Sequence, residues 1–295
     1  MHIAITGATG FLGQFLSDHF LYKFGNDVKL IALVSNKNKN YKYKDNPNTK
    51  VYYLDKTPIS TIFNNDKIDV VIHTATLYGR NKENVIDVER VNVEFPLVIL
   101  SEAIKHNVKI FVNTSTILSK NINPYALTKS HFEDWLSLYA DKIKCINLKL
   151  DHFYGPNDNP IKFIAWIIEQ LKHNVSYIDL TEGSQIRDFI YIDDVVSAFD
   201  IIIKNEKQIP IGKLNTFEVG TNCKTSIKEM VLTIKEKLGN TQTTLNFGAI
   251  PYRKNEVLDY IVDTTNLRLL GWKPKYPSIE QGIQKLLEIE NWEKL

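Results

Sequence analysis

The segment Gly7-Ala8-Thr9-Gly10-Phe11-Leu12-Gly13 separates a short apolar stretch, His2–Thr6, from an amphipathic one, Phe11–Phe24. Its glycines have the spacing G-x-x-G-x-x-G. In this spacing the first glycine permits a tight turn, the second lets the backbone approach a pyrophosphate, and the third lets a helix pack closely on a strand. The following helix would offer free N–H groups and positive dipole charge to phosphates. We therefore predict a nucleotide cofactor site here, although a tight turn in an unrelated α/β fold is an alternative. The expected contact residues are Gly7, Thr9, Gly10, Phe11, Leu12 and Gly13.

Short apolar segments alternate with longer amphipathic segments over the first 150 residues. Short segments that are rich in β-branched residues and apolar at successive positions are typical of strands buried on both faces of a parallel sheet. The predicted strands are His2–Thr6, Lys29–Val34, Val51–Leu54, Val70–Thr74, Ile110–Thr114 and Ile146–Leu150. The predicted helices are Phe11–Phe24, Val93–His106 and Pro124–Tyr139. This alternation predicts an α/β fold with a Rossmann-type, doubly wound parallel sheet.

The alternation changes after Leu150. There we predict a loop over His152–Pro160, strands at Asp188–Ile192 and Thr216–Val219, and helices at Ile161–His173, Ser226–Leu238 and Ser278–Glu288. Asp193 and Asp194 are expected to cap a further helix. We expect residues 1–150, joined by about 188–220, to form the cofactor-binding domain. Residues 151–187 and 221–295 are expected to form a smaller α/β part that binds the substrate.

Composition limits the class of protein. The chain has 295 residues, of which 43% are hydrophobic and 24% are charged, as in ordinary globular proteins. A net charge of +2 argues against a nucleic-acid partner. The two cysteines cannot form a disulfide framework or a cysteine-built zinc site, so we expect no metal. No apolar run is long enough to span a membrane and no signal peptide is apparent, so we expect a cytoplasmic protein.

The end of the second predicted strand bears on the choice between NAD and NADP. An acidic residue at this position usually binds the ribose 2′-hydroxyl of NAD. Ser35-Asn36-Lys37 stands here instead, with no carboxylate before Asp45. Lys37 could contact a 2′-phosphate, so we expect NADP(H) to be preferred, with NAD(H) possible. The alternative is that these lysines belong to a solvated loop. Asp55 could accept a hydrogen bond from the adenine or could only form a turn.

Three residues form the predicted catalytic set. Tyr125 and Lys129 lie four positions apart, which places them on one face of a helix. A nearby Lys⁺ should lower the pKa of the phenol, which could then exchange a proton with a carbonyl or hydroxyl. Thr116 follows the preceding predicted strand, at the edge of the sheet where parallel-sheet sites lie. Its hydroxyl could hydrogen-bond the same substrate oxygen.

These motifs together resemble the extended short-chain dehydrogenase/reductase family, and within it the nucleotide-sugar epimerases, dehydratases and 4-keto reductases. The resemblance covers most of the chain and also includes His73-Thr74-Ala75-Thr76, Asn92, Tyr154-Gly155-Pro156 and Arg187-Asp188-Phe189-Ile190-Tyr191. It implies that Tyr125 is the acid/base, that Lys129 tunes it and holds the nicotinamide ribose, and that Thr116 orients the sugar. It further implies cofactor contacts at Ala75, Thr76 and Asn92, and substrate contacts at Asn157, Arg187, Arg253 and Glu256.

The sequence also departs from the family pattern. Dehydratases carry Asp-Glu after the active-site Thr, whereas Ile117-Leu118 stands here and cannot transfer protons. No cysteine neighbours Thr116, so the reductases that also epimerise C3 and C5 are not matched either. His152 replaces the Asn that usually precedes Tyr-Gly-Pro, which puts the phosphate contact there in doubt.

The segments His73–Arg80 and Leu150–Pro156 resemble the subgroup of CDP-abequose and CDP-paratose synthases. That resemblance implies NADPH-dependent reduction of the 4-keto group of a nucleotide-linked deoxy sugar, in surface polysaccharide biosynthesis. Tyr78 and Arg80 would then reach the substrate, or else would form a surface turn. A 4-epimerase with tightly bound NAD and a non-catalytic NADP sensor are the alternatives.

The face of the Tyr125 helix that turns away from the site carries His131, Trp135 and Leu138. In the family this face often packs against a second subunit. The resemblance therefore implies a homodimer, with a monomer core contact as the alternative.

Overall fold

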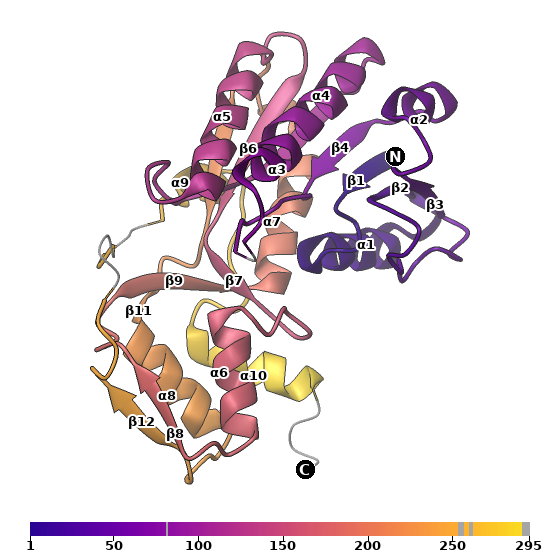
Figure 1. The fold of residues 1–295 in the computed structure, drawn as a ribbon. Helices are drawn as coiled ribbons and strands as arrows, with labels where there is room; N and C mark the ends of the chain where they lie inside the picture. The colour runs from indigo at the N-terminus through magenta and orange to yellow at the C-terminus, as the bar shows by residue number, and fades with distance from the viewer. Residues whose placement is uncertain (81, 253–256, 260–261, 291–295) are drawn as a thin grey trace. The chain divides into compact units, whose positions relative to one another are not determined.

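Seven strands form the main sheet of the computed structural model, which describes residues 1–80, 82–252, 257–259 and 262–290. Their spatial order is β10-β6-β5-β4-β1-β2-β3 (Figure 1). The strands are β1 His2–Thr6, β2 Lys29–Val34, β3 Thr49–Tyr53, β4 Val70–His73, β5 Ile110–Thr116, β6 Lys144–Leu150 and β10 Asn215–Val219. The pairs β1–β2, β1–β4, β2–β3 and β4–β5 are parallel. The order 3-2-1-4-5-6 confirms the predicted Rossmann-type sheet.

Helices cover the sheet on both faces. The helices of this part are α1 Phe11–Phe24, α2 Ile59–Asn65, α3 Val85–Glu89, α4 Phe95–Lys105 and α5 Pro124–Leu138, with short 3₁₀ turns at Gly25–Asp27 and Glu206–Gln208. Ala4 of β1 belongs to a buried cluster with Leu100 of α4 and Phe132 of α5. Ile3 and Ile5 are equally buried and, by the alternation of side chains along a strand, face the opposite side, where α1 lies (Figure 1). The sheet is therefore apolar on both faces.

The predicted helix over Val93–His106 is present as α4, Phe95–Lys105. It is preceded by α3 and by a π-helical segment at Arg90–Glu94, which were not predicted. Pro96 has no N–H to donate to the carbonyl four residues earlier, and the Phe95 N–H reaches back five residues to the Arg90 carbonyl. This wide turn places Asn92 against the site described below.

The chain divides into two compact units, residues 1–149 with 202–217, and residues 150–201 with 218–295. The second unit holds a three-stranded sheet, β11-β9-β7, and a two-stranded sheet, β12-β8. Its elements are β7 His152–Tyr154, α6 Phe163–Lys172, β8 Tyr177–Leu180, β9 Ile186–Tyr191, β11 Lys224–Ser226, α8 Ile227–Lys237, β12 Thr244–Phe247, α9 Thr265–Leu269 and α10 Ile279–Ile289. The helix α7, Ile192–Lys204, runs across the boundary in sequence.

Two predictions for the second unit were wrong. His152–Pro160 is not all loop, because β7 pairs with β9, which lies more than thirty residues further along the chain. Asp194 does not cap a helix. It lies in the first turn of α7, and its carboxylate accepts hydrogen bonds from the N–H groups of Lys275 (2.6 Å) and Tyr276 (2.8 Å). Both features depend on partners distant in sequence.

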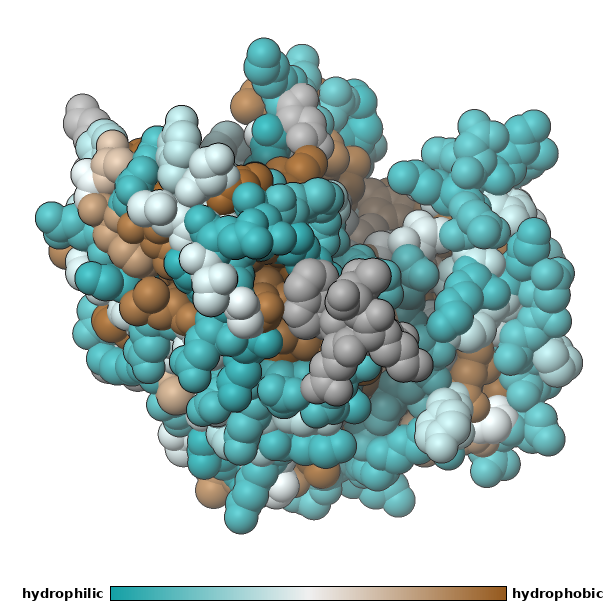
Figure 2. Space-filling view, turned by 90° about the horizontal axis from the view of Figure 1, so that it is seen from below, coloured by the Kyte–Doolittle hydropathy of each residue, from teal (hydrophilic) through white to brown (hydrophobic). Residues whose placement is uncertain are grey.

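The surface seen in Figure 2 is mostly hydrophilic, with hydrophobic residues in several separate groups. Among the described residues, no helix combines the length and the apolar character needed to cross a membrane.

Candidate active site

The glycine loop is packed so tightly that it admits no side chain at two of its glycines. Gly7 has φ +66°, and a Cβ there would lie 2.7 Å from the Ala75 backbone N. A Cβ on Gly13 would lie 2.3 Å from the Gly7 carbonyl oxygen. Gly10 precedes α1, and no side chain caps that helix. The first-turn N–H groups of α1 therefore remain suited to a phosphate, and the bare backbone of the loop suits close approach of a dinucleotide.

The ends of β2 and β3 place the residues predicted to contact the adenosine half of a cofactor. Ser35 and Lys37 are exposed directly after β2, and the Asn36 side chain accepts a hydrogen bond from the Asn38 N–H at 3.1 Å. Asp55 is exposed after β3. Because β1, β2 and β3 are adjacent and parallel, these residues and the glycine loop lie at the same edge of the sheet.

The end of β4 is held against β1. The Thr6 hydroxyl contacts His73 Nδ1 at 2.8 Å and accepts from the Thr74 and Ala75 N–H groups at 3.2 and 3.3 Å. Burial lowers the pKa of His73 well below its ordinary value, so this residue is neutral. Ala75 and Thr76 thus follow β4 next to the glycine loop.

Both the oxygen and the nitrogen of the Asn92 side-chain amide form hydrogen bonds with other protein groups. Its oxygen accepts from the Thr76 hydroxyl (3.1 Å) and the Leu77 N–H (2.8 Å). Its nitrogen donates to the Leu77 carbonyl (2.9 Å) and the Thr128 hydroxyl (3.0 Å). The residue is 1% exposed. Asn92 therefore links the segment after β4 to α5. Both polar atoms of its side chain already have protein partners, so the side chain does not support the predicted cofactor contact.

The three predicted catalytic residues lie together. Asn123 caps α5 by accepting from the Ala126 N–H at 2.8 Å, and Pro124 begins the helix, which places Tyr125 in its first turn. The Lys129 Nζ lies 5.9 Å from the centroid of the Tyr125 ring. Thr116 ends β5, and its hydroxyl is hydrogen-bonded with Tyr125.

The electrostatics of Tyr125 differ from the prediction. Burial raises the pKa of the phenol above its ordinary value, and the neighbouring Tyr78 raises it further. The hydrogen bond with Thr116 and the charge of Arg80 lower this pKa. Lys129 donates a hydrogen bond to the Thr114 carbonyl (2.9 Å), is 2% exposed, and has its own pKa lowered to about 8 by burial.

Glu133 is a site residue that the sequence analysis missed. Its carboxylate hydrogen-bonds the Ser115 hydroxyl and forms an ion pair with Lys149 at 3.3 Å. Its charge also raises the pKa of Lys129 against the larger effect of burial. The signal was present in the sequence, because Glu133 lies four residues after Lys129 on the same helix.

The lowered pKa of Lys129 makes the stability of the protein depend on pH. Between about pH 8 and pH 10.5 the unfolded chain binds more protons at this residue than the folded one, so stability should rise with pH across that window. We expect wild type to gain unfolding free energy relative to Lys129→Met between about pH 7 and about pH 10. Urea denaturation of both proteins at each pH measures this. Lys213→Met, at an exposed lysine, is the control, and its difference in unfolding free energy from wild type should not change with pH. A difference between wild type and Lys129→Met that is equally constant with pH would contradict the prediction.

Tyr78 and Arg80 are near the catalytic residues. The Tyr78 ring lies 4.8 Å from the Tyr125 ring, centroid to centroid, and the Arg80 Cζ lies 5.0 Å from the Tyr78 ring centroid. Tyr78 is half-buried against Tyr125, whereas Arg80 is exposed, and their contact with a substrate stays a prediction.

The substrate residues predicted in the second unit are only partly described. His152 is exposed on β7, with its ring 5.8 Å from that of Phe189 and its Nδ1 against the Asp151 carboxylate. Asn157 is exposed in a turn with φ +61°. Arg187 on β9 donates to the carbonyls of Ile186 (2.7 Å) and Val257 (2.8 Å). Arg253 and Glu256 lie outside the described residues. His152 and Arg187 come from paired strands.

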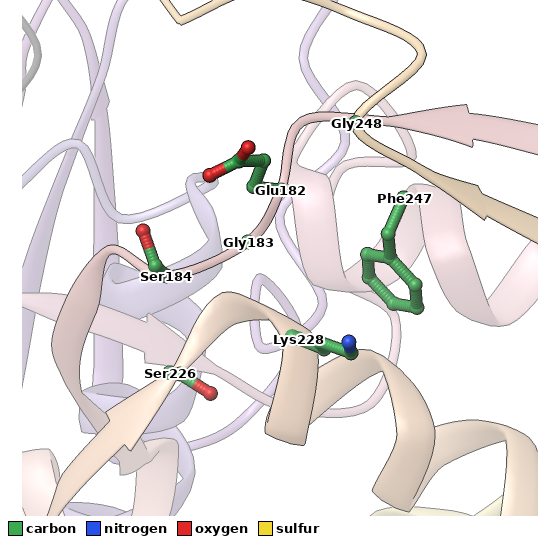
Figure 3. A pocket seen from close by; sticks show the side chains of 7 residues that line it. All are labelled: Glu182, Gly183, Ser184, Ser226, Lys228, Phe247 and Gly248. Atoms are coloured by element: carbon green, nitrogen blue, oxygen red, sulfur yellow. The ribbon is translucent and has the colours of Figure 1, made fainter.

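The second unit also has an open pocket of about 610 Å³. Its lining is polar and apolar in about equal parts and comprises Glu182, Gly183, Ser184, Ser226, Lys228, Phe247 and Gly248 (Figure 3). The Lys228 Nζ lies 5.1 Å from the centroid of the Phe247 ring, toward which the side chain extends in Figure 3.

A Rossmann-type sheet, a glycine loop before the first helix and a Thr-Tyr-Lys set define a nucleotide-dependent oxidoreductase. The chain belongs to the NAD dependent epimerase/dehydratase family, whose model matches residues 3–220. It is thus an enzyme of the NAD(P)-dependent oxidoreductase type, and the predicted family is confirmed.

Individual relatives match nearly the whole chain. CDP-abequose synthase of Salmonella typhimurium is 33% identical, over 97% of each chain. Human dTDP-D-glucose 4,6-dehydratase is 26% identical, over 99% of this chain and 92% of that one. Among solved structures, the UDP-glucose 4-epimerase of Thermotoga maritima, determined with UDP-glucose, superposes with a TM-score of 0.83 at 25% identity over 99% of each chain.

Proposed function

We propose that the protein reduces the 4-keto group of a nucleotide-linked deoxy sugar with NADPH. The observation that carries this proposal is the set Thr116, Tyr125 and Lys129 followed by the apolar pair Ile117-Leu118, in a chain similar over its full length to CDP-abequose synthases. The human relative and the Thermotoga maritima structure are also named for enzymes that act on nucleotide sugars, which supports a nucleotide sugar as the substrate class.

In this proposal the protein residues bind, orient and move a proton. The glycine loop and the N-terminus of α1 fit the pyrophosphate of a dinucleotide, which supplies a hydride when bound. The Tyr125 phenol gives its proton to the sugar oxygen as the hydroxyl forms. Thr116 orients that oxygen, and Lys129 stays close to Tyr125 and the Thr114 carbonyl. His152, Asn157, Arg187, Arg253 and Glu256 remain our proposed substrate contacts.

The side chains after Thr116 argue against dehydration. Removing a C5 proton and expelling a C6 hydroxyl needs an acid/base pair, and neither Ile117 nor Leu118 can transfer a proton. The similarity to dTDP-D-glucose 4,6-dehydratase therefore does not indicate the same reaction for this chain.

A 4-epimerase is the second candidate, since the Thermotoga maritima structure is a 4-epimerase at 25% identity. An epimerase recycles its cofactor, whereas a reductase must exchange it. Incubating the enzyme with CDP-, GDP-, dTDP- or UDP-linked 4-hydroxy sugars and no added cofactor separates the two. Catalytic interconversion of 4-epimers would overturn the reductase proposal. NADPH oxidation on adding a 4-keto nucleotide sugar supports it and rules out a non-catalytic NADP sensor.

We expect the enzyme to bind NADPH at least about tenfold more tightly than NADH, because charge-assisted hydrogen bonds contribute about 1.5–3 kcal/mol. The exposed Lys37 after β2 carries this expectation, together with the absence of an acid there. Lys37→Glu should reduce or reverse the preference, and Lys213→Glu, a matched change at another exposed lysine, should not. Calorimetric titration of both cofactors measures this. Equal affinities in wild type would show that Lys37 is only loop charge.

A homodimer also remains our proposal. On α5, Trp135 is 38% and Leu138 66% exposed, and Val98 of α4 is 44% exposed, so apolar surface is available on these helices. His131 is already paired with Glu89 of α3 at 3.3 Å.

A further inference from the structure

The segment that follows β4 is fixed in place up to Leu77. Asn92 holds Leu77 by both its N–H and its carbonyl, and the same amide donates to Thr128 on the helix that carries Tyr125. Tyr78, the next residue, is therefore held in a defined position beside α5. Gly79 has φ +68°, a left-handed conformation that reverses the chain and brings Arg80 back over the ring of Tyr78.

The result is a stack that ends on the proposed proton donor. The guanidinium of Arg80 lies 5.0 Å from the Tyr78 ring centroid, and the Tyr78 ring lies 4.8 Å from the Tyr125 ring at an interplanar angle of 37°. These distances are those of a cation–π contact and of a tilted aromatic pair in contact. Both side chains thus contact a protein partner, Tyr78 the Tyr125 ring and Arg80 the Tyr78 ring.

We propose that Tyr78 and Arg80 are positioning residues for Tyr125. Tyr78 fixes the orientation of the Tyr125 ring, and Arg80 supplies a permanent positive charge near the phenol. This inference rests on the proposed role of Tyr125 as the proton donor.

The charged groups around Tyr125 favour this assignment. Among the described residues, the titratable groups that face it are Tyr78 and Arg80 from the segment after β4, and Lys129 from α5. Arg80 lowers the pKa of Tyr125, and Tyr78 raises it. The pKa of Lys129 falls to about 8, so this amine loses charge in the mildly alkaline range, whereas a guanidinium stays charged throughout.

The test is the pH profile of kcat/KM. Reduction needs protonated Tyr125, so the rate falls at high pH as the phenol ionises. Removing the charge with Arg80→Gln should move this high-pH limb upward by about 0.5–1 unit, because the phenolate loses a favourable neighbour. Arg80→Lys should restore most of the shift. Lys82→Gln, which removes an exposed positive charge two residues further on, should leave the profile of wild type unchanged.

The other outcomes overturn the proposal. If Arg80→Gln raises KM and leaves the limb in place, Arg80 binds the substrate directly. If the limb is unmoved and KM is also unchanged, the stack has no role in the reaction. For Tyr78, Phe should preserve kcat because it keeps the stack, and Ala should lower kcat several-fold. Equal kcat in Tyr78→Ala and wild type would remove Tyr78 from the inference.

A measurement without substrate separates this inference from the proposed reaction. With ¹³Cζ-tyrosine, the signal of Tyr125 is identified by its loss in Tyr125→Phe. In Arg80→Gln this signal should begin to titrate at higher pH than in wild type, and unchanged titration contradicts the inference. The same pH profile can be recorded on 4-epimerisation, so failure of the reductase proposal leaves the inference testable.

Discussion

Tyr125→Phe is expected to lower kcat by about 10²–10⁴-fold, the usual contribution of a positioned acid or base. The substitution removes only the hydroxyl. The ring keeps its contact with the Tyr78 ring at 4.8 Å and its place beside Lys129, so the local packing should survive. Cofactor affinity should stay within about twofold of wild type, because the glycine loop is untouched.

Steady-state rates and calorimetric titration of NADPH test this expectation together. Tyr22→Phe is the matched control, since Tyr22 on α1 is 95% exposed. A Tyr125→Phe enzyme that kept more than about a tenth of the wild-type rate would remove Tyr125 from the mechanism. Thr116→Ala should cost less, because it removes one orienting hydrogen bond and leaves the acid in place.

The second large effect is expected from Gly13→Ala. The new Cβ would lie 2.3 Å from the Gly7 carbonyl oxygen and 2.9 Å from the Ala8 Cα, which are both backbone atoms. The loop must therefore move away from α1, and it loses the shape that suits a pyrophosphate. We expect cofactor affinity to fall by at least about tenfold and unfolding free energy to fall by about 1–3 kcal/mol.

Gly212→Ala separates these two effects. Gly212 has φ +93°, and a Cβ there would meet nothing within 4 Å, so alanine should reduce stability through backbone strain alone. Cofactor affinity should then be unchanged in Gly212→Ala and reduced in Gly13→Ala. Wild-type affinity in Gly13→Ala would show that the loop adapts without loss, and that its glycines do not explain cofactor binding.

The first half of the fold follows from local sequence. The bounds of β1, α1 and β2 agree with those predicted, because the two strands are short apolar segments and each element is bounded by a glycine or polar turn. The second half was predicted less well. The strands β7, β8 and β12 have three or four residues each, and they exist because of pairing with strands far along the chain.

The candidate site divides in the same way. The sequence alone placed Thr116, Tyr125 and Lys129 together, since helical spacing and the ends of parallel strands are local rules. It did not show that the side-chain amide of Asn92 forms hydrogen bonds with Leu77 and Thr128, because those contacts span 15 and 36 residues.

The sequence by itself determined the fold class, the glycine loop and the family, because each depends on residue types at short, regular spacings. Only the tertiary structure decided the electrostatics of the proton donor. A pKa depends on burial and on charges that converge from separate segments. Burial raises the pKa of Tyr125 and lowers that of Lys129, and Arg80 reaches Tyr125 from the segment after β4 through the ring of Tyr78. The spacing of Tyr125 and Lys129 in one helix contains no information about that third segment.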